Sequence, residues 1–349
     1  MKRRRDTRRE YGSIEVVPDL PLLVDASSGW PTALIEDQGK QSLGKLKRHQ
    51  QMYRGHGIHV GFVINIGAAN FNLNRFTRAL GKWATQNEML FDLHFMQSGR
   101  PLSGPVTTMI ENGAQAIVAV GGDGTVSAVA SEMVGWDVPI GIIPAGTANG
   151  AAVALGLPLA FDRALDLLVD GSGKRALDVI KVGERVYTIS VSVGVSSQSL
   201  QNLTARSKER LGVMGYYLSG LKEASLANSK RFSVELDGEQ LDDEFLEIAI
   251  LNMGILGLPD IFLGGEILPD DGLLRMFAVK QASLKGTVWQ LLRGRSRVNS
   301  RVHLRDIKRI KIDGDAEAVV QADGDVIGTL PVSAEILPAA IQVLVPGAL

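Results

Sequence analysis

The sequence predicts a protein of the α/β + β class, in which a doubly wound α/β domain is followed by an antiparallel β-sandwich. The length of 349 residues suits two domains. Over residues 58–172, short apolar runs alternate with amphipathic segments, which is the pattern of a parallel sheet covered by helices. Over residues 173–349, apolar residues recur at alternate positions and Asp-Gly pairs separate the runs, as in antiparallel hairpins. Residues 1–57 lack both patterns and are interpreted as a partly irregular N-terminal extension.

The α/β domain is predicted to alternate strands with helices. Its strands are nearly continuous apolar runs, such as AQAIVAV and VPIGIIP, because a parallel strand between two helical layers is buried on both faces. The predicted strands cover 59–65, 91–96, 114–120 and 138–144, and the predicted helices cover 73–87, 105–112, the segment after Thr125 and 148–155.

The β-sandwich is predicted from runs in which every second residue is apolar, the pattern of strands with one buried face. The Asp-Gly pairs at 237–238 and 313–314 mark hairpin turns. A helical insertion is expected near residues 205–228. The predicted strands lie within 231–240, 245–253, 273–280, 307–314, 318–328 and 341–346.

The composition excludes several classes of function. The chain has no cysteine, which rules out disulfides, cysteine metal sites and thiol nucleophiles. A net charge of −1 argues against a nucleic-acid partner. The start of the chain has no signal-peptide pattern, so we expect a cytoplasmic protein. The uncharged stretch 138–161 is long enough to span a membrane, but its prolines and glycines predict a strand, a loop and a short helix instead.

Local basic clusters predict contact with an anionic membrane surface. Basic residues gather at positions 2–9 and again between Lys285 and Lys311, and each cation near an anionic leaflet gains about 1 kcal/mol. Trp289 and the stretch 212–221 add aromatic and apolar side chains suited to the membrane interface. We therefore expect peripheral attachment at the inner membrane face, and both a monomer and a homodimer remain open.

The strongest chemical signal is the segment GGDGT at 121–125, which directly follows a predicted strand and begins a predicted helix. Glycines let a ligand approach the backbone closely, and the amides and positive dipole end of a helix favour an anion such as phosphate. Phosphate repels the carboxylate of Asp123, unless the two share a divalent cation or the carboxylate accepts a proton from an attacking hydroxyl. The segment therefore indicates phosphoryl transfer.

A second glycine-containing loop, PAGTAN at 144–149, follows the next predicted strand and begins the next helix. Parallel strands place both loops at the same edge of the sheet, and ligands bind at that edge in open α/β sheets. We therefore expect the two loops to face one crevice and to hold the phosphates of one nucleotide.

With these loops, the sequence resembles the diacylglycerol kinase catalytic-domain family, which includes bacterial lipid kinases and the sphingosine and ceramide kinases. Four segments carry the resemblance in the family's order: GGDGT at 121–125, PAGTAN at 144–149, LPDDGLL at 268–274 and VQADGD at 320–325. NAD kinases and phosphofructokinases have a similar α/β fold, but the last two segments look like lipid kinases. The resemblance implies that ATP binds in the cleft between the domains. The residues it implies for the nucleotide are Asn65, Gly121, Gly122, Asp123, Gly124, Thr125, Gly146, Thr147 and Asn149.

The resemblance also implies a structural magnesium ion. In the bacterial branch of the family, an aspartate and two backbone carbonyls hold this ion, and the matching positions are Asp271, Leu268 and Leu273. Asp178 matches a further member of the same acidic network. Carboxylate and carbonyl oxygens are ligands that suit Mg²⁺.

Carboxylates at two places are candidates for the proton acceptor. The family carries a DGE motif whose glutamate has this role, and the matching segment reads Asp323-Gly324-Asp325, so that Asp325 replaces the glutamate and Asp323 is the other acid of the motif. In the sphingosine kinase branch the aspartate of GGDGT is assigned the role, which implies Asp123. Asp-Gly at 323–324 is equally a strong hairpin signal.

Several positions depart from the family pattern. Of the usual NPxSG after the first strand only Asn65 remains, the Asn and Glu that normally follow GGDGT are Ser127 and Ala128, and the Asp of GTxND is Gly150. These changes affect the nucleotide and metal sites and leave the pattern of the fold intact.

We therefore predict an ATP- and Mg²⁺-dependent kinase that phosphorylates the hydroxyl of a membrane lipid, either diacylglycerol or a sphingoid or ceramide-type alcohol. The alternatives are an NAD kinase-like enzyme and a catalytically impaired pseudokinase that binds a lipid or a nucleotide.

Overall fold

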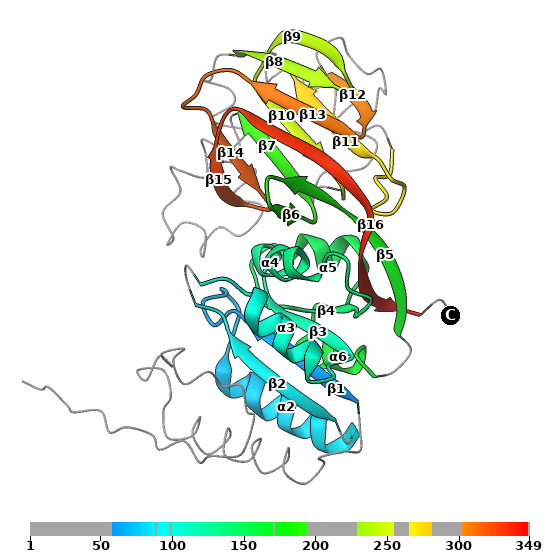
Figure 1. Cartoon of the computed structure of the whole chain (residues 1–349). Coiled ribbons are helices and arrows are strands. Elements are labelled where there is room, and N and C mark those ends of the chain that lie inside the picture. Colours follow the sequence, from blue (N-terminus) through cyan, green and yellow to red (C-terminus); the bar gives the residue numbers. More distant parts are fainter. Residues whose placement is uncertain are drawn as a thin grey trace, which may run out of the picture.

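The computed structural model has the predicted α/β + β architecture (Figure 1). The predicted extension 1–57, the helical insertion 205–228 and Trp289 lie outside the residues that the structure describes. The described residues are 58–87, 89–97, 100–169, 172–194, 229–254, 265–280 and 302–347.

The α/β domain is built on parallel strands in the order β2-β1-β3-β4. The strands are β1 His59–Ile64, β2 Leu90–Phe95, β3 Ala116–Gly121 and β4 Ile140–Pro144, and the helices are α2 Leu73–Asn87, α3 Ser103–Glu111, α4 Asp123–Met133, α5 Gly150–Ala154 and α6 Phe161–Asp166. Side chains of β1 alternate between two cores, with Phe62 and Ile64 on one face and Val63 on the other. Helices α2 and α6 cover the first core, and α3, α4 and α5 cover the second, so the sheet is doubly wound as predicted.

Helix α2 shows why the sequence pattern was informative in this domain. Phe76, Leu80, Trp83 and Ala84 recur at helical spacing and are all buried in the core. The helix has the predicted bounds, 73–87. Helix α6, by contrast, was not predicted.

The β-sandwich packs two layers of antiparallel strands around one core. The strands are β7 Ser190–Gly194, β8 Lys230–Leu236, β9 Glu239–Phe245, β10 Glu247–Leu251, β11 Leu274–Val279, β12 Val302–Ile307, β13 Arg309–Asp313, β14 Val319–Ala322 and β15 Asp325–Thr329. One layer has the order β12-β11-β10-β7-β14-β15, and β13, β8 and β9 belong to the other. Val193 and Ile250 of the first layer meet Phe232 and Ile312 of the second in the core.

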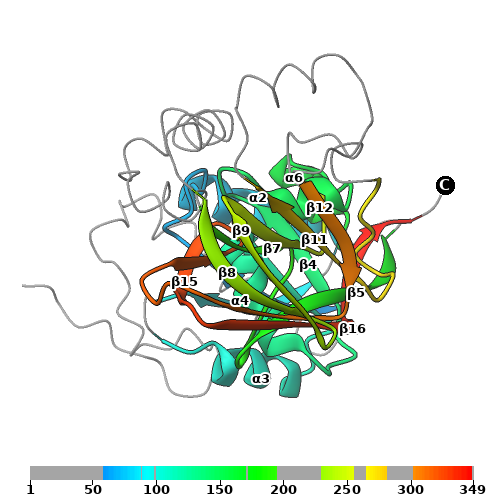
Figure 2. The same cartoon turned by 90° about the horizontal axis from the view of Figure 1, so that it is seen from above.

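The last strand connects the two domains. Strand β16, Val332–Pro346, pairs with β13 in the sandwich and continues alongside β5, Ser172–Val182 (Figures 1 and 2). At its far end Val343 pairs in parallel with Ile140 of β4. The sheet of the α/β domain thus continues through β16 into the sandwich. The sequence predicted only 341–346 as the final strand, and the predicted division at 172/173 falls at the start of β5.

Candidate active site

The GGDGT segment forms a tight turn at the carboxyl end of β3, where α4 begins at Asp123. No side chain fits at Gly121, because a Cβ there would lie 2.3 Å from Thr125 Oγ1. Thr125 is buried, and its Oγ1 accepts a hydrogen bond of 3.1 Å from Asn65 Nδ2 at the end of β1. Asn65 and Thr125, both expected to contact the nucleotide, therefore bond to each other and support the turn from inside.

The PAGTAN loop follows β4 and is closed by its own asparagine. Asn149 has a φ of 52°, and its side chain accepts a hydrogen bond from Gly146 N at 2.8 Å and donates one to Gly146 O at 3.0 Å. Asn70 Nδ2 donates to the same carbonyl at 2.7 Å. Thr147, in the middle of the loop, is exposed. The loop therefore has a fixed backbone and presents Thr147 to solvent.

The two loops are in backbone contact, as their positions on neighbouring strands predicted. A Cβ on Gly146 would lie 2.4 Å from Gly122 Cα, which no real side chain tolerates. Strands β3 and β4 pair up to this point, with Gly121 opposite Pro144. Glycine is needed at position 146 because the two backbones approach each other so closely, and a Cβ on Gly122 would lie 3.1 Å from Gly146 Cα.

Asp123 joins the two loops. Its Oδ2 accepts a hydrogen bond from Gly150 N and its Oδ1 accepts one from Ala151 N, each at 3.0 Å, so the side chain caps the first turn of α5. Burial raises the pKa of Asp123, the amide bonds act against this rise, and the charge of Asp325 adds to it. A proton-accepting role for Asp123 stays a prediction, and the geometry gives this carboxylate a structural task as well.

The other two candidate carboxylates lie on the hairpin β14–β15 and have different surroundings. Asp323 is half-buried, and its Oδ1 accepts hydrogen bonds from Ile189 N at 3.0 Å and Ser190 N at 2.8 Å. Asp325 is exposed and lies against the GGDGT turn at 121–125, named the phosphate loop for the role predicted from the sequence. A Cβ on Gly124 of this loop would lie 2.5 Å from Asp325 Oδ2. The structure thus brings Asp123 and Asp325 to the same end of α4, where Asp325 faces solvent.

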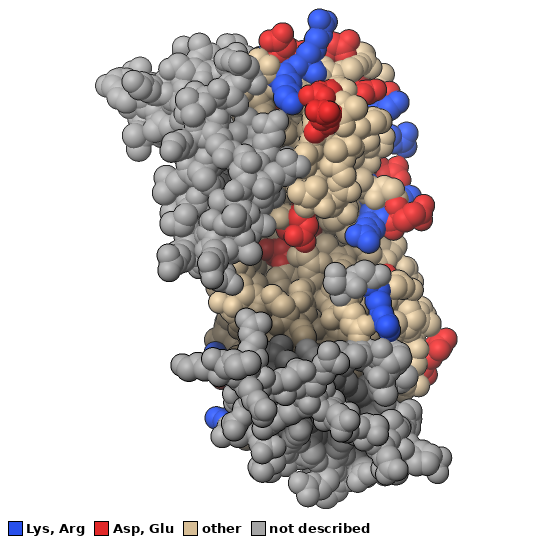
Figure 3. Space-filling view, turned by 90° about the vertical axis from the view of Figure 1, so that its left-hand side faces the viewer, with Lys and Arg blue, Asp and Glu red and all other residues tan. Residues whose placement is uncertain are grey.

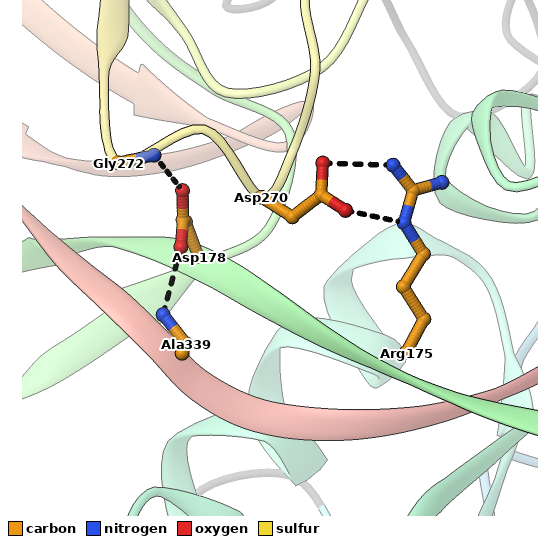
Figure 4. A network of polar contacts seen from close by, with 5 residues as sticks. All are labelled: Arg175, Asp178, Asp270, Gly272 and Ala339. Carbon is orange, nitrogen blue, oxygen red and sulfur yellow. Dashed lines mark hydrogen bonds and ion pairs between the residues drawn. The ribbon is translucent and has the colours of Figure 1, made fainter.

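The predicted magnesium segment lies beside Asp178, on β5 (Figure 4). Asp178 Oδ2 accepts a hydrogen bond from Gly272 N at 2.6 Å and its Oδ1 accepts one from Ala339 N at 2.7 Å. Arg175 makes two bonds of 2.8 Å to Asp270, and this pairing lowers the pKa of the Asp270 carboxyl.

Asp271 is the remaining acid of this segment, and its Oδ1 accepts a hydrogen bond from Leu273 N at 2.9 Å. Within the part of the chain that the structure describes, no group of three His, Asp or Glu side chains is placed to hold a metal ion. Asp178 and Asp271 thus accept hydrogen bonds from backbone amides, and Asp270 is paired with Arg175. A structural Mg²⁺ held by Asp271 and the carbonyls of Leu268 and Leu273 stays a prediction.

Two residues of the site were not recognised from the sequence. Ser127, regarded only as a departure from the family pattern, is buried in α4, where its Oγ donates a hydrogen bond to Asp323 and lies 3.1 Å from Thr188 Oγ1. Asn252 is fully buried and donates to the carbonyls of Asp178 and Thr188 at 2.8 and 2.9 Å. Both contacts join segments far apart in the chain, which no local pattern reveals.

Comparison with known proteins gives consistent matches over both domains. The model of the diacylglycerol kinase catalytic domain matches residues 59–182, and that of the YegS C-terminal NAD kinase β-sandwich-like domain matches residues 189–345. A diacylglycerol kinase of Staphylococcus saprophyticus is 27% identical over 68% of this chain and 79% of its own length. An uncharacterised protein of Synechocystis is 30% identical over 66% of this chain, and the match spans about half, 54%, of that relative.

Solved structures agree on the fold. The crystal structure of a diacylglycerol kinase from Bacillus anthracis aligns with a TM-score of 0.65 over 82% of this chain and 96% of its own, at 22% identity. The fold of this class is an α/β domain followed by an antiparallel β-sandwich, and the model has both. The chain belongs to the diacylglycerol kinase catalytic-domain family.

Proposed function

We propose that the protein is an ATP-dependent lipid kinase that transfers the terminal phosphate of ATP to the hydroxyl of a membrane lipid. The observation that carries this proposal is the position of Asp325, an exposed carboxylate of the β-sandwich that rests against Gly124 of the phosphate loop. A proton acceptor and a phosphate loop from two different domains meet there, and the names of relatives such as the Staphylococcus diacylglycerol kinase agree with lipid phosphorylation.

The residues present fit a nucleotide with its magnesium ion. Gly122 and Gly146 have no side chains where the phosphates would approach the backbone, and the start of α4 offers its positive dipole end to an anion. Mg²⁺ is typically bound by one or two carboxylates together with substrate phosphates, and Asp123 at the start of α4 would be the carboxylate that holds it. When bound, the ion would neutralise charge on the phosphates.

Asp325 is the preferred proton acceptor among the candidates. Both oxygens of Asp123 already accept backbone hydrogen bonds, and the Asp323 carboxylate already accepts hydrogen bonds from Ser127, Thr188, Ile189 and Ser190. A base must come within about 2.6 to 3.2 Å of the proton that it takes, which favours an accessible carboxylate beside the phosphate loop. The role of the loops is then to hold the phosphates, and that of Asp325 is to accept the proton of the lipid hydroxyl.

The acceptor is proposed to be a lipid presented at a membrane surface, with diacylglycerol tested first and sphingosine or ceramide as further members of the class. In the described part of the chain, no helix is long and apolar enough to cross a bilayer. On the face shown in Figure 3, the charged side chains of both signs are interspersed. Peripheral attachment is proposed to depend on the basic clusters at 2–9 and between Lys285 and Lys311, of which the structure describes residues 302–311.

The test is a radiolabelled ATP assay with diacylglycerol, sphingosine and ceramide in anionic vesicles and with NAD in solution. We expect label in a lipid, and we expect Asp325→Asn to lower kcat at least a hundredfold, a loss typical of a missing base. Label in NAD would indicate an NAD kinase instead. ATP binding without any transfer would indicate a pseudokinase, and either result would reject the proposal.

A further inference from the structure

The two strands of the hairpin that carries Asp325 are connected by the same type of turn as those of a second hairpin on the surface of the molecule. Asp323 and Gly324 have φ values of 48° and 86°, and Asp237 and Gly238 of the hairpin β8–β9 have 50° and 92°. Both pairs thus have the positive φ values that a two-residue Asp-Gly hairpin requires. The turn alone explains why Asp-Gly occurs at both places, so any further role of Asp323 must come from its surroundings.

Those surroundings differ sharply. The Asp237 side chain is exposed and accepts hydrogen bonds from Lys308 N and Arg309 N within the sandwich. Asp323 is half-buried, and its carboxylate accepts hydrogen bonds from groups of α4 and of the segment 188–190. Its donors are Ser127 Oγ of α4, Thr188 N at 2.9 Å, Thr188 Oγ1 at 3.3 Å, Ile189 N at 3.0 Å and Ser190 N at 2.8 Å.

These donors belong to both domains. Ser127 lies on the helix that begins in the phosphate loop, and Thr188 to Ser190 connect β6, Arg185–Tyr187, with β7 of the sandwich. Two residues after Asp323, Asp325 touches Gly124 of the phosphate loop. One carboxylate therefore ties the hairpin to α4, and the same hairpin carries the proposed base.

We infer that Asp323 is a positioning residue that clamps the β14–β15 hairpin to α4 and to the β6–β7 connection, and so holds Asp325 at the phosphate loop. The clamp is independent of the proposed function, and only its effect on catalysis rests on that function. The bonds to the carboxylate are charge-assisted, the stronger kind of hydrogen bond in proteins. Burial raises the pKa of Asp323, and the hydrogen bonds from Ser127 and the backbone amides act against this rise.

The alternative is that Asp323 is itself the proton acceptor. Its carboxylate already accepts from Ser127, Thr188, Ile189 and Ser190, so a substrate hydroxyl would have to displace these donors. Substitution of the neighbouring Ser127 separates the two roles, because a serine-to-alanine change loosens a clamp but leaves a base in place.

The experiment measures hydrogen exchange at the amides of Ile189 and Ser190, together with kcat and its pH profile. The full chain is compared with Asp323→Asn, Ser127→Ala and the matched control Asp237→Asn. We expect Asp323→Asn to speed exchange at both amides at least tenfold, since each loses a charged acceptor. Ser127 bonds to neither amide but contacts both Asp323 and Thr188, so faster exchange there in Ser127→Ala would be transmitted through these two residues of the clamp.

In Asp323→Asn and Ser127→Ala, kcat should fall while its pH dependence keeps the wild-type shape. The control Asp237→Asn should change neither the amide exchange nor kcat. If exchange at the two amides is unchanged in Asp323→Asn, the clamp is disproved. If Asp323→Asn removes activity while Ser127→Ala has the wild-type amide exchange and the wild-type kcat, Asp323 is the base instead. Should Asp323→Asn not fold, exchange in Ser127→Ala decides the question. Absence of lipid phosphorylation by the wild type would reject the proposed function and leave the exchange test valid.

Discussion

Two single residues of the candidate site, Gly122 and Gly146, bring the backbones of the two glycine loops into contact. A Cβ on Gly146 would come within 2.4 Å of the Gly122 backbone, so Gly146→Ala must push the two loops apart. We expect a loss of about 1 to 3 kcal/mol in stability, typical of overpacking. Because positioning errors of about 1 Å reduce catalysis about a hundredfold, kcat/KM for ATP should fall by that order. Steady-state kinetics and urea unfolding measure both effects.

The matched control for this change is Gly104→Ala. Gly104 lies in α3, and a Cβ there would have nothing within 4 Å. Alanine is favoured over glycine within a helix, so this variant should be as stable as the wild type or slightly more so, with unchanged kinetics. Wild-type kinetics in Gly146→Ala would show that the contact between the loops does not matter for the reaction.

A second prediction for a single residue concerns Asp123. Asp123→Ala leaves the amides of Gly150 and Ala151 without their acceptor, which should cost about 1 to 3 kcal/mol of stability. We expect the fold to persist by circular dichroism and phosphate transfer to be abolished, because the two loops lose their link. A variant with full transfer activity would remove Asp123 from the mechanism altogether.

How far single residues could be predicted depends on the distance along the chain. The glycines at 121–125 and 144–149 were predicted because strand, turn and helix follow one another directly. The contact between Ser127 and Asp323 joins residues 196 positions apart, and serine is an ordinary helix residue. The hydrogen bonds of Asp323 could therefore be seen only in the fold, although its turn was predicted.

Among the elements, β1 and β2 carry a titratable pair at their amino ends, away from the candidate site. His59 Nε2 lies 3.0 Å from Asp92 Oδ2, and His59 Nδ1 lies 3.2 Å from the carbonyl of Asn112. The hydrogen bond to Asp92 is the main cause that raises the pKa of His59 above 6.5, while burial acts in the opposite direction. With an acceptor at each ring nitrogen, the site favours the doubly protonated imidazolium.

This pair predicts a pH dependence of stability. A raised pKa in the folded state means that the contribution is fully present below about pH 6.5 and is lost as the pH rises through the folded value. We expect the wild type to lose about 1 kcal/mol more than His59→Gln between pH 5.5 and pH 8.5. Urea unfolding at both pH values measures the difference, and equal losses in the two proteins would refute a charged His59.

The predictability of whole elements follows a physical rule. Helix α2 and strands β1 and β3 have a periodic or continuous apolar pattern of their own, so their existence and most of their bounds were predicted. Strand β16 has a long N-terminal part that pairs with β5, and its register shifts between Leu337 and Ile341. Such a strand is defined by its partners rather than by its own periodicity, and only its last residues were recognised.

At the scale of the whole molecule, β16 joins domains that the sequence presents as separate. It pairs with β13 and β5 and ends beside β4, so one strand belongs to both halves of the protein. The hydrogen bond from Ser127 to Asp323 adds a second connection, between α4 and the sandwich. Separate domains commonly unfold independently, whereas two connections of this kind couple them.

We therefore expect both domains to unfold in one cooperative transition. Exchange followed in urea should give the same midpoint for β1 and for β10. Leu344→Ala removes a buried side chain of β16 that packs in the α/β core, and it should lower both midpoints together by the equivalent of about 2 to 5 kcal/mol. Leu159→Ala, at a position 56% exposed, should lower neither. If Leu344→Ala lowered the midpoint of β1 and left that of β10 in place, the shared strand would not couple the domains, and the contact of Asp325 with Gly124 would have to depend on the Asp323 hydrogen bonds instead.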